Sequence, residues 1–436
     1  MRDDIKKVKL YAHTPYIGTT GYNQHARNFL RNLSELVDVK VNNSTVGASW
    51  DHMEDEPHNS ESYITDTDKK LLVNQTLRSA DSWVIEPIYS NHKNDFTHNV
   101  NLVLSETYNH LFYKDYIGPK IAYNVWEATL QPQHFFDKLK EFDQIWVPSQ
   151  WQARCTINQG ADPAKVKVVP EGVDTTVFFP EEPKAVLDYV DDRFKFVLFG
   201  RWDYRKSTKE IIETFLREFT SEEPVDLIIS IDNPWGEKMD GFKTTEERLN
   251  HYNLVDDRIK IKHFPSREDY VTYLKNGHVF LSCARGEGWN LPLIEAMACG
   301  TPSIYSADSG QMEFAAGKGL PVRISGYTKA SDIAYGSFLG NNAGLGEYPE
   351  PDFDDLAIVM RDAFENYTSH KQRALEEAKI IHRDFNWNRV AEIGKDTLAD
   401  FVENYKEPEN INTVTVTYTD SPIVNITGDT VRDYRV

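Results

Sequence analysis

Residues 279–302, VFLSCARGEGWNLPLIEAMACGTP, decide the fold, because they read as a strand, a short loop and a helix. The apolar residues 279–283 predict an interior parallel strand. Asn290 suits the N-cap of the helix, Pro292 falls in its first turn, and Gly300 marks its end. Such a unit leaves backbone N–H groups at the rim of a sheet, where they attract an anion such as phosphate.

Two carboxylates flank this predicted anion site, Glu287 in the loop and Glu295 in the helix. A carboxylate accepts two hydrogen bonds at once, which suits a vicinal diol such as the edge of a ribose or a hexose. The alternative is that Glu295 only complements the helix dipole and that Glu287 is a solvated loop residue. Within this longer segment, we interpret the pair as evidence for a ligand that carries both phosphate and sugar.

The segment resembles the E-x7-E signature of the retaining GT-B glycosyltransferases of family 4, whose usual form is E-G-F-G-L-P-x-x-E-A-M-A-x-G-x-P. Asn290 replaces the usual Gly, and Trp289 replaces the usual Phe. The resemblance implies that Glu287 orients the donor sugar and Glu295 holds the ribose. The residues that follow the signature are Glu287, Gly288, Trp289, Asn290, Leu291, Pro292, Glu295, Ala296, Met297, Ala298, Gly300 and Pro302. The resemblance implies that Gly288, Trp289, Asn290 and Leu291 contact the donor.

Composition narrows the class of protein. The 436 residues have room for two or three domains, and the formal net charge of −20 argues against a general polyanion-binding surface. No long apolar run predicts a membrane span, and the charged N-terminus does not read as a signal peptide. The three cysteines lack metal-site spacing. We therefore expect a cytoplasmic protein with reduced thiols and no metal.

The first part of the chain alternates predicted strands with helical stretches, which is typical of a doubly wound parallel sheet. The predicted strands are residues 7–12, 82–90, 101–106, 120–128 and 144–149. Gly21 lies in a glycine loop after the first strand, where it lets the backbone approach a ligand; the alternative is an ordinary turn. The resemblance implies that this loop faces the donor phosphates and the acceptor. We expect His25, in the following helix, to lie on the helix surface.

Glu127, in YNVWEATLQP, stands where related enzymes carry a His that touches the donor sugar. Glu127 is predicted to hold a sugar hydroxyl or steer the acceptor, with a buried ion pair as an equally weighted alternative. The triplet at residues 66–68 is similar to the metal motif of GT-A transferases, but no apolar strand flanks it. We interpret that triplet as part of a solvated loop.

The second domain is expected to open with a strand at residues 194–199, followed by Gly200, Arg201 and Lys206. Cations just after a strand reach the crevice where open α/β sheets bind ligands. The resemblance implies that Arg201 and Lys206 bind the diphosphate and stabilise it as it leaves. Arg205 and Lys209 are interpreted as solvated charges on a helix face.

Two further segments resemble parts of the family's donor pocket. Lys262, His263 and Phe264 end a predicted strand at the place where the family binds the nucleotide base, largely through backbone groups. Gly310 and Glu313 match a G-x-x-E segment that closes the pocket, although Glu313 also fits an ordinary helix residue.

The predicted fold class is α/β of the GT-B type, with two Rossmann-like doubly wound domains facing across a cleft. Residues 1–180 form the acceptor-binding domain and residues 181–385 the donor domain, joined by a linker at 165–180 that resembles the family's P-x-G-V-D crossing. Residues 386–407 form a crossover helix back to the first domain. The tail at 408–436 alternates β-branched and polar residues, which predicts a hairpin or the start of a further domain.

The predicted function is a retaining, metal-independent transfer of a sugar from a nucleotide-diphosphate donor, with a UDP- or GDP-sugar favoured and no cofactor. The expected acceptor is a glycan, a lipid or a protein, while modified DNA is disfavoured by the acidic balance. Two alternatives stay open. One is a sugar-nucleotide 2-epimerase on the same fold, and the other is a non-catalytic module that binds a sugar or nucleotide.

Overall fold

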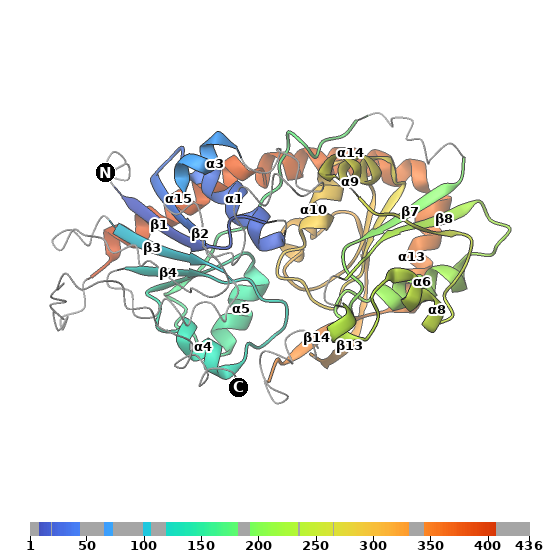
Figure 1. Ribbon diagram of the computed structural model, residues 1–436, viewed down its shortest axis with the longest axis horizontal. Helices are drawn as coiled ribbons and strands as arrows, with labels where there is room; N and C mark the ends of the chain where they lie inside the picture. Colours follow the sequence, from blue (N-terminus) through green and yellow to red (C-terminus); the bar gives the residue numbers. More distant parts are fainter. Residues whose placement is uncertain are drawn as a thin grey trace.

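A computed structural model describes residues 8–18, 20–43, 65–72, 99–105, 119–181, 192–233, 236–264, 266–330 and 344–406. The predicted strand at 82–90 and the predicted β-rich tail at 408–436 lie outside these ranges. Figure 1 shows two α/β domains side by side, with the long C-terminal helices along both.

The first domain is built on a six-stranded parallel sheet in the order β2-β1-β3-β4-β5-β6. Its strands are β1 (Lys9–Thr14), β2 (Asp38–Asn43), β3 (Asn99–Leu104), β4 (Lys120–Tyr123), β5 (Gln144–Val147) and β6 (Val166–Val168). Its helices are α1 (Gly21–Leu33), α3 (Asp66–Leu71), α4 (Gln133–Leu139) and α5 (Gln150–Asn158). Strand β2 was not expected, because the polar sequence DVKVNN offers few apolar residues to a sheet.

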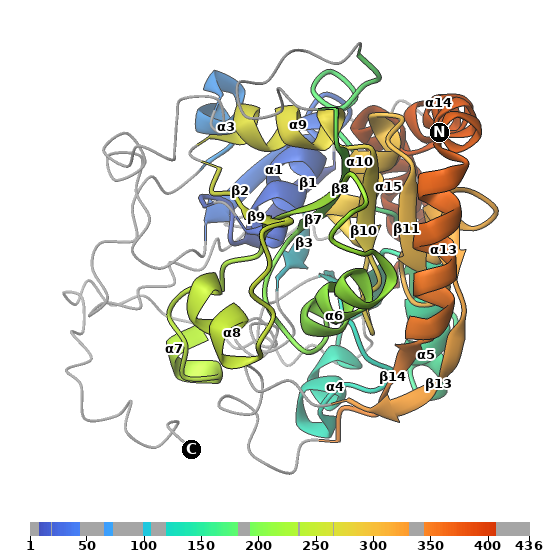
Figure 2. The same ribbon diagram turned by 90° about the vertical axis from the view of Figure 1, so that its right-hand side faces the viewer.

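The second domain repeats this plan with a six-stranded parallel sheet in the order β12-β11-β10-β7-β8-β9. Its strands are β7 (Phe194–Phe199), β8 (Val225–Ser230), β9 (Ile259–Ile261), β10 (Val279–Ser282), β11 (Ser303–Ser306) and β12 (Leu320–Val322). Every residue of β7 is buried, including Lys195 among its apolar residues, as expected of an interior strand with helices on both faces. Figure 2 shows this domain from its outer side.

The helices of the second domain cover both faces of its sheet. They are α6 (Thr208–Glu218), α7 (Gly236–Met239), α8 (Thr245–His251), α9 (Arg267–Asn276), α10 (Leu291–Ala298), α11 (Met312–Ala315), α13 (Phe353–Glu365) and α14 (Tyr367–Asp384). A separate antiparallel hairpin, β13 (Ile324–Lys329) and β14 (Glu347–Pro351), lies in the chain between β12 and α13. The predicted GT-B class, two Rossmann-like domains, is confirmed by this architecture.

The last helix, α15 (Trp387–Asn404), packs on the first domain, as the crossover-helix prediction expects. Its apolar residues Trp387, Val390 and Leu398 join the core around β1 and α1. The two chain segments that cross between the domains run side by side, because the Val173 N–H donates to the Phe385 carbonyl over 2.8 Å. No helix in the described part of the chain is both long and apolar enough to span a bilayer.

The triplet at residues 66–68 corrects the sequence interpretation, because it starts α3 and is not part of a solvated loop. Thr65 caps this helix, and Asp68 is fully buried. The Asp68 carboxylate accepts a hydrogen bond from the Tyr16 hydroxyl at 2.6 Å and pairs with Arg31 at 2.7 Å. These partners come from distant segments, so local sequence alone does not reveal them.

Replacing Gly172 by Ala is expected to weaken the contact between the two crossing segments. A Cβ at this position would lie 2.8 Å from the Trp387 ring and 3.0 Å from the Phe385 carbonyl oxygen. Overpacking of this kind typically lowers the free energy of unfolding by about 1–3 kcal/mol, measurable by urea denaturation. Gly344→Ala is the matched control, because its added Cβ meets nothing within 4 Å; equal losses in both variants would contradict the expectation.

Candidate active site

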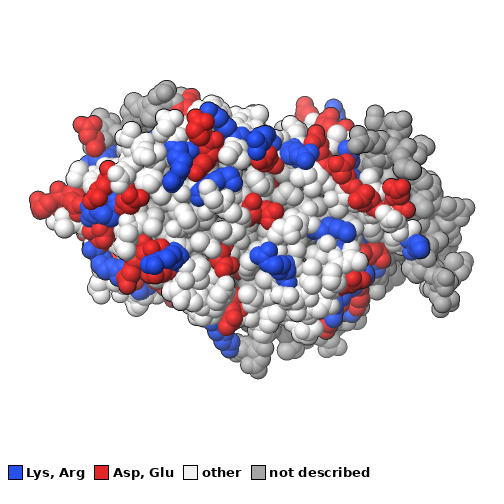
Figure 3. Space-filling model, turned by 180° about the vertical axis from the view of Figure 1, so that it is seen from behind, with Lys and Arg blue, Asp and Glu red and all other residues white. Residues whose placement is uncertain are grey.

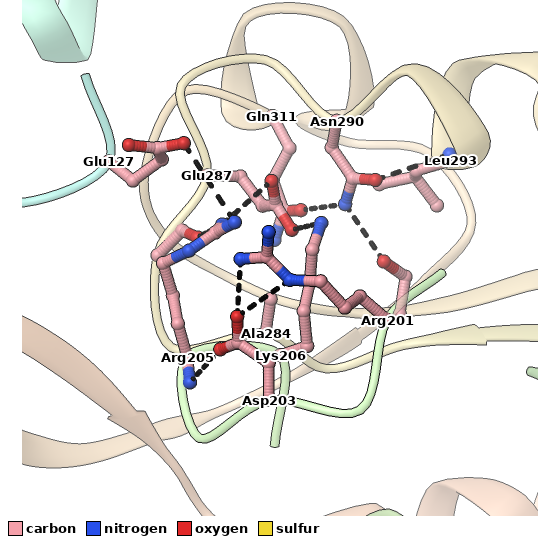
Figure 4. Close-up of polar contacts among 12 residues, drawn as sticks. Glu127, Arg201, Asp203, Arg205, Lys206, Ala284, Glu287, Asn290, Leu293 and Gln311 are labelled. Atoms are coloured by element: carbon pink, nitrogen blue, oxygen red, sulfur yellow. Dashed lines mark hydrogen bonds and ion pairs between the residues drawn. The ribbon is translucent and has the colours of Figure 1, made fainter. Parts of the chain in front are cut away.

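The loop between β7 and α6 brings cations to one point at the edge of the second sheet. Gly200 has a φ of +144°, which favours glycine and lets the chain turn directly after β7. The Arg201 guanidinium pairs with Asp203, with an Nε–Oδ2 distance of 3.0 Å. Lys206 Nζ forms an ion pair with Glu287 Oε1. Figure 4 shows Arg201, Lys206 and Glu287 converging beside the start of α10.

The prediction that Arg205 is a solvated helix-face charge is wrong. Its side chain is only 7% exposed, and Nη1 donates to the Gly286 carbonyl at 2.7 Å and lies 3.3 Å from Glu287 Oε2. Nη2 lies 3.8 Å from Glu127 Oε1 of the first domain (Figure 4). The cause is that α6 begins only at Thr208, so Arg205 belongs to the preceding loop and turns inward.

Glu287 is buried with its charge compensated. Burial alone would raise the pKa of its carboxyl, but Lys206 and Arg205 outweigh burial and hold that pKa below its usual value. The Glu287 backbone is also fixed, since its N–H donates to Ser309 Oγ at 3.2 Å and its carbonyl accepts from the Gly310 N–H at 2.8 Å. The site therefore presents an ionised carboxylate that two cations hold in place.

Three glycines explain why the loop carrying Glu287 can lie so close to its neighbours. A Cβ at Gly288 would come within 2.4 Å of Val125 in the first domain, and one at Gly286 within 2.2 Å of the Glu127 carbonyl oxygen. A Cβ at Gly310 would come within 1.8 Å of the Gly288 carbonyl oxygen. The loop is therefore pressed between the first domain and the chain after β11, which only glycine permits.

The start of α10 confirms the predicted N-cap at Asn290. Its side-chain oxygen accepts from the Leu293 N–H at 3.4 Å, and its Nδ2 donates to Ser282 Oγ at 2.8 Å and to Gln311 Oε1 at 2.6 Å (Figure 4). This amide is thus engaged in shaping the helix start. A Cβ on Gly21 would lie 3.9 Å from Leu291 Cδ1, so the glycine loop of the first domain faces the beginning of α10.

Trp289, which the signature places among the donor contacts, lies behind this loop. Its ring is 2% exposed and packs against Phe314 and Phe385, with ring centroids 5.0 Å and 5.8 Å away. The Trp289 side chain therefore supports the loop from the core, and its predicted contact with the donor stays a prediction.

Glu295 is buried, and two side chains of α9 hold its carboxylate. The Tyr270 hydroxyl donates to Oε2 at 2.6 Å, and Arg267 Nη2 lies 3.2 Å from Oε1. Burial raises the pKa of Glu295 above its usual value. Arg267 also donates through Nη1 to Gln24 Oε1 in α1 at 2.7 Å, so the same arginine spans both domains.

The predicted base-binding residues lie at the carboxyl end of β9. The Lys262 N–H donates to the Ile229 carbonyl at 2.8 Å, and the exposed His263 pairs with Asp232 at 2.7 Å. The Phe264 ring packs edge-on against Phe199, 4.9 Å between centroids. Their position at this edge of the sheet is where a nucleotide base is expected to bind, and their role in binding it stays a prediction.

Glu313 makes a contact between the domains. Its Oε2 accepts from the Gln150 N–H, in the first turn of α5, at 2.7 Å.

The prediction that His25 lies on the helix surface is wrong, because its side chain is 1% exposed. Its ring lies 4.6 Å from that of Tyr123 and 5.7 Å from that of Trp387, and its Nδ1 is 3.6 Å from Glu171 Oε1. Among the described residues, neither ring nitrogen has a hydrogen-bond partner. Burial lowers the pKa of His25 to about 3, so the imidazole is neutral at pH 7. α15 covers the face that the local sequence suggests is exposed.

Glu171, from the linker, is fully enclosed in the same cluster. Burial, together with repulsion from Glu127 and Glu287, raises its pKa from 4.5 to about 8.

Sequence reasoning and structure agree on most of the cluster and differ in three side chains. Arg201, Lys206, Glu287 and Glu127 lie together in Figure 4, whereas Glu295 lies further along α10. Arg205, Arg267 and Tyr270 were not predicted to take part. The position of Arg205 next to Lys206 could have indicated that it belongs to the site. The sequence of α9 offers no comparable indication for Arg267 and Tyr270.

Comparison with known proteins adds the class of domain. Residues 181–319 match the family described as Glycosyl transferases group 1. The chain therefore carries a glycosyltransferase domain on a GT-B fold. Among solved structures, Anabaena HepE in complex with UDP-glucose is similar with a TM-score of 0.66 and 15% identity, covering 90% of this chain and 99% of that one. Sucrose-phosphate synthase from Thermosynechococcus elongatus is similar with a TM-score of 0.64 and 13% identity, covering 91% and 100%.

Curated relatives match over shorter stretches. Mannosylfructose-phosphate synthase of Agrobacterium fabrum is 27% identical over 240 residues, 52% of this chain and 46% of that protein. D-inositol 3-phosphate glycosyltransferase of Mycobacterium bovis (strain BCG / Pasteur 1173P2) is 27% identical over 177 residues, 39% and 35%. The matched part thus spans less than half the length of these relatives.

Replacing Glu171 by Gln is expected to stabilise the protein at pH 8 more than at pH 5. Because the folded-state pKa of Glu171 is raised to about 8 from 4.5, its contribution to stability is complete below pH 4.5 and lost as the pH rises towards 8. The variant should therefore gain on the order of a few kcal/mol at pH 8. Urea denaturation of both proteins across this pH range measures the difference, and a gap that does not change with pH would contradict the buried carboxyl.

Proposed function

We propose that this protein is a retaining glycosyltransferase that moves a sugar from a nucleotide-diphosphate donor to a hydroxyl acceptor without a metal ion. The observation that carries this proposal is the cluster of Arg201, Lys206 and Glu287 beside the start of α10. A glycosyltransferase domain over residues 181–319 supports it.

The chemistry of this cluster suits a departing diphosphate. As the bond from the sugar to the phosphate breaks, negative charge grows on the leaving group, and fixed cations and helix N–H groups lower the barrier by stabilising it. Lys206 and Arg201 supply positive charge, and α10 points its N-terminus at the same place. This protein charge takes the part that a divalent cation has in other transferases, which is why we propose metal independence.

The carboxylates have a different task in the proposal. Glu287 accepts hydrogen bonds from hydroxyls of the donor sugar while Lys206 bridges it to the diphosphate. Glu127 approaches from the first domain and holds or steers the acceptor. We assign no protein nucleophile, because the leaving phosphate is proposed to take the acceptor proton on the same face of the sugar. Closure of the two domains around the sugar limits hydrolysis by water.

For the donor we propose a UDP- or GDP-sugar, and the UDP-glucose in complex with Anabaena HepE supports UDP as the first choice to test. For the acceptor we propose a glycan, a lipid or a protein in preference to DNA. The face in Figure 3 carries Lys and Arg interspersed with Asp and Glu, and the chain has a net charge of −20. We propose a cytoplasmic location.

Lys206→Ala is expected to remove most of the thermal stabilisation by the matching nucleoside diphosphate. A ligand at about 100 times its Kd stabilises the native state by about 2.7 kcal/mol, and losing a partly buried cation proposed to face the diphosphate should abolish most of this. The measurement is a thermal-shift panel with UDP, GDP and ADP. Lys209→Ala is the control, because Lys209 pairs with Glu213 on the surface of α6. Equal shifts for all nucleotides, or an unaffected Lys206→Ala, would count against the donor site.

Release of nucleoside diphosphate distinguishes the transferase from its alternatives. A transferase releases UDP from UDP-glucose faster when an acceptor is added. A 2-epimerase changes the sugar without needing an acceptor, and a binding module releases nothing. The reaction is followed by free UDP with and without a panel of p-nitrophenyl hexosides, sugar phosphates and polyols, and release that no acceptor accelerates would argue against transfer.

A further inference from the structure

The hairpin β13–β14 belongs to the second domain by chain order but bonds to the first. The Thr129 N–H donates to the Glu347 carbonyl at 3.2 Å, and the Leu130 N–H donates to the Leu345 carbonyl at 3.3 Å. The Glu347 N–H donates in return to Thr129 Oγ1 at 2.8 Å. Figures 1 and 2 both place the hairpin next to α4 and α5. The hairpin thus extends across the domain boundary.

An apolar contact reinforces these hydrogen bonds. Trp126 and Ala128 of the first domain form a small buried cluster with hairpin-side residues, which are Ala330, Leu345 and Tyr348. The Trp126 indole donates to the Leu130 carbonyl at 2.7 Å, which closes the turn at residues 126–130. This turn therefore has one face against the hairpin.

The loop carrying Glu287 also packs closely against the same turn. A Cβ on Gly286 would lie 2.2 Å from the Glu127 carbonyl oxygen and 2.9 Å from the Tyr348 ring. Gly286 therefore lies close to both the Glu127 backbone and the hairpin residue Tyr348. The Glu127 side chain, 20% exposed, reaches towards Arg205, 3.8 Å from the guanidinium (Figure 4).

We propose that the β13–β14 hairpin is a positioning element for the acceptor, which acts by fixing the turn at residues 126–130 so that Glu127 faces the reacting centre. Thr129 and Tyr348 are the positioning residues, and neither needs to touch substrate. The inference rests on the proposed function. In this inference, the positioning of the acceptor depends partly on the second domain, through a hairpin that belongs to neither of the two six-stranded sheets.

Gly346→Ala tests this inference without altering a side chain of the site. Gly346 has a φ of +72°, and a Cβ there would lie 2.3 Å from Thr129 Oγ1 and 2.9 Å from the Leu130 nitrogen, so Ala should push the hairpin off the turn. Misplacing a reacting group by about 1 Å can slow a reaction up to about a hundredfold. The control is Gly326→Ala, on the same hairpin, where the added Cβ meets nothing within 4 Å.

The readout is the ratio of glucose transfer to hydrolysis, with UDP-glucose as donor and p-nitrophenyl hexosides as acceptors. We expect Gly346→Ala to lower this ratio at least about tenfold and to leave the thermal shift by UDP unchanged, while Gly326→Ala resembles the wild type. Thr129→Val, which removes only the oxygen that accepts from Glu347, should lower the ratio in the same direction.

A double-variant cycle with Glu127→Gln decides whether the hairpin acts through Glu127. If it does, Gly346→Ala adds little to the loss caused by Glu127→Gln, since coupled residues are not additive. Multiplied losses, an unchanged ratio or a lost UDP shift in Gly346→Ala would overturn the inference. Wild-type protein that releases neither UDP from UDP-glucose nor GDP from GDP-sugars in any of these reactions would instead overturn the proposed function, and the inference with it.

Discussion

The buried charge cluster around Glu287 is the interaction on which the arrangement of this site depends. A carboxylate taken out of water is stable only when cations and hydrogen bonds compensate it. Lys206 and Arg205 provide that compensation, and both come from the loop that ends β7. Because Arg205 also approaches Glu127, the cluster links two loops of the second domain to the first domain. These are the loop between β7 and α6 and the loop that carries Glu287. Charge pairs among its own side chains therefore hold the site together.

The sequence predicted the elements that depend on local pattern. Mostly apolar runs indicated β7 and β10, and the N-cap and Gly300 indicated the ends of α10, because strand burial and helix capping depend on neighbouring residues. That Arg201, Lys206 and Glu287 lie close together was expected for a related reason, since all three follow strands whose carboxyl ends share one edge of the sheet.

The misjudged residues share a cause, which is that distant segments decide their environment. Asp68 is buried by Tyr16 and Arg31, and His25 is covered by a helix that lies more than 350 residues later in the chain. Arg205 looked like a helix charge because the start of α6 was placed too early. At these three positions, contacts with segments far away in the sequence, rather than the residue type, decide whether the side chain is exposed or buried.

The bond between the Val173 N–H and the Phe385 carbonyl has a consequence for motion between the domains. The two segments that connect the domains are hydrogen-bonded to each other at this place, so together they can act as a hinge. Sliding of one domain past the other would break that bond, whereas rotation about the hinge keeps it. Rotation of this kind separates the two domains least next to Val173 and more with distance from it, so the place where the chain crosses influences the direction from which a substrate enters.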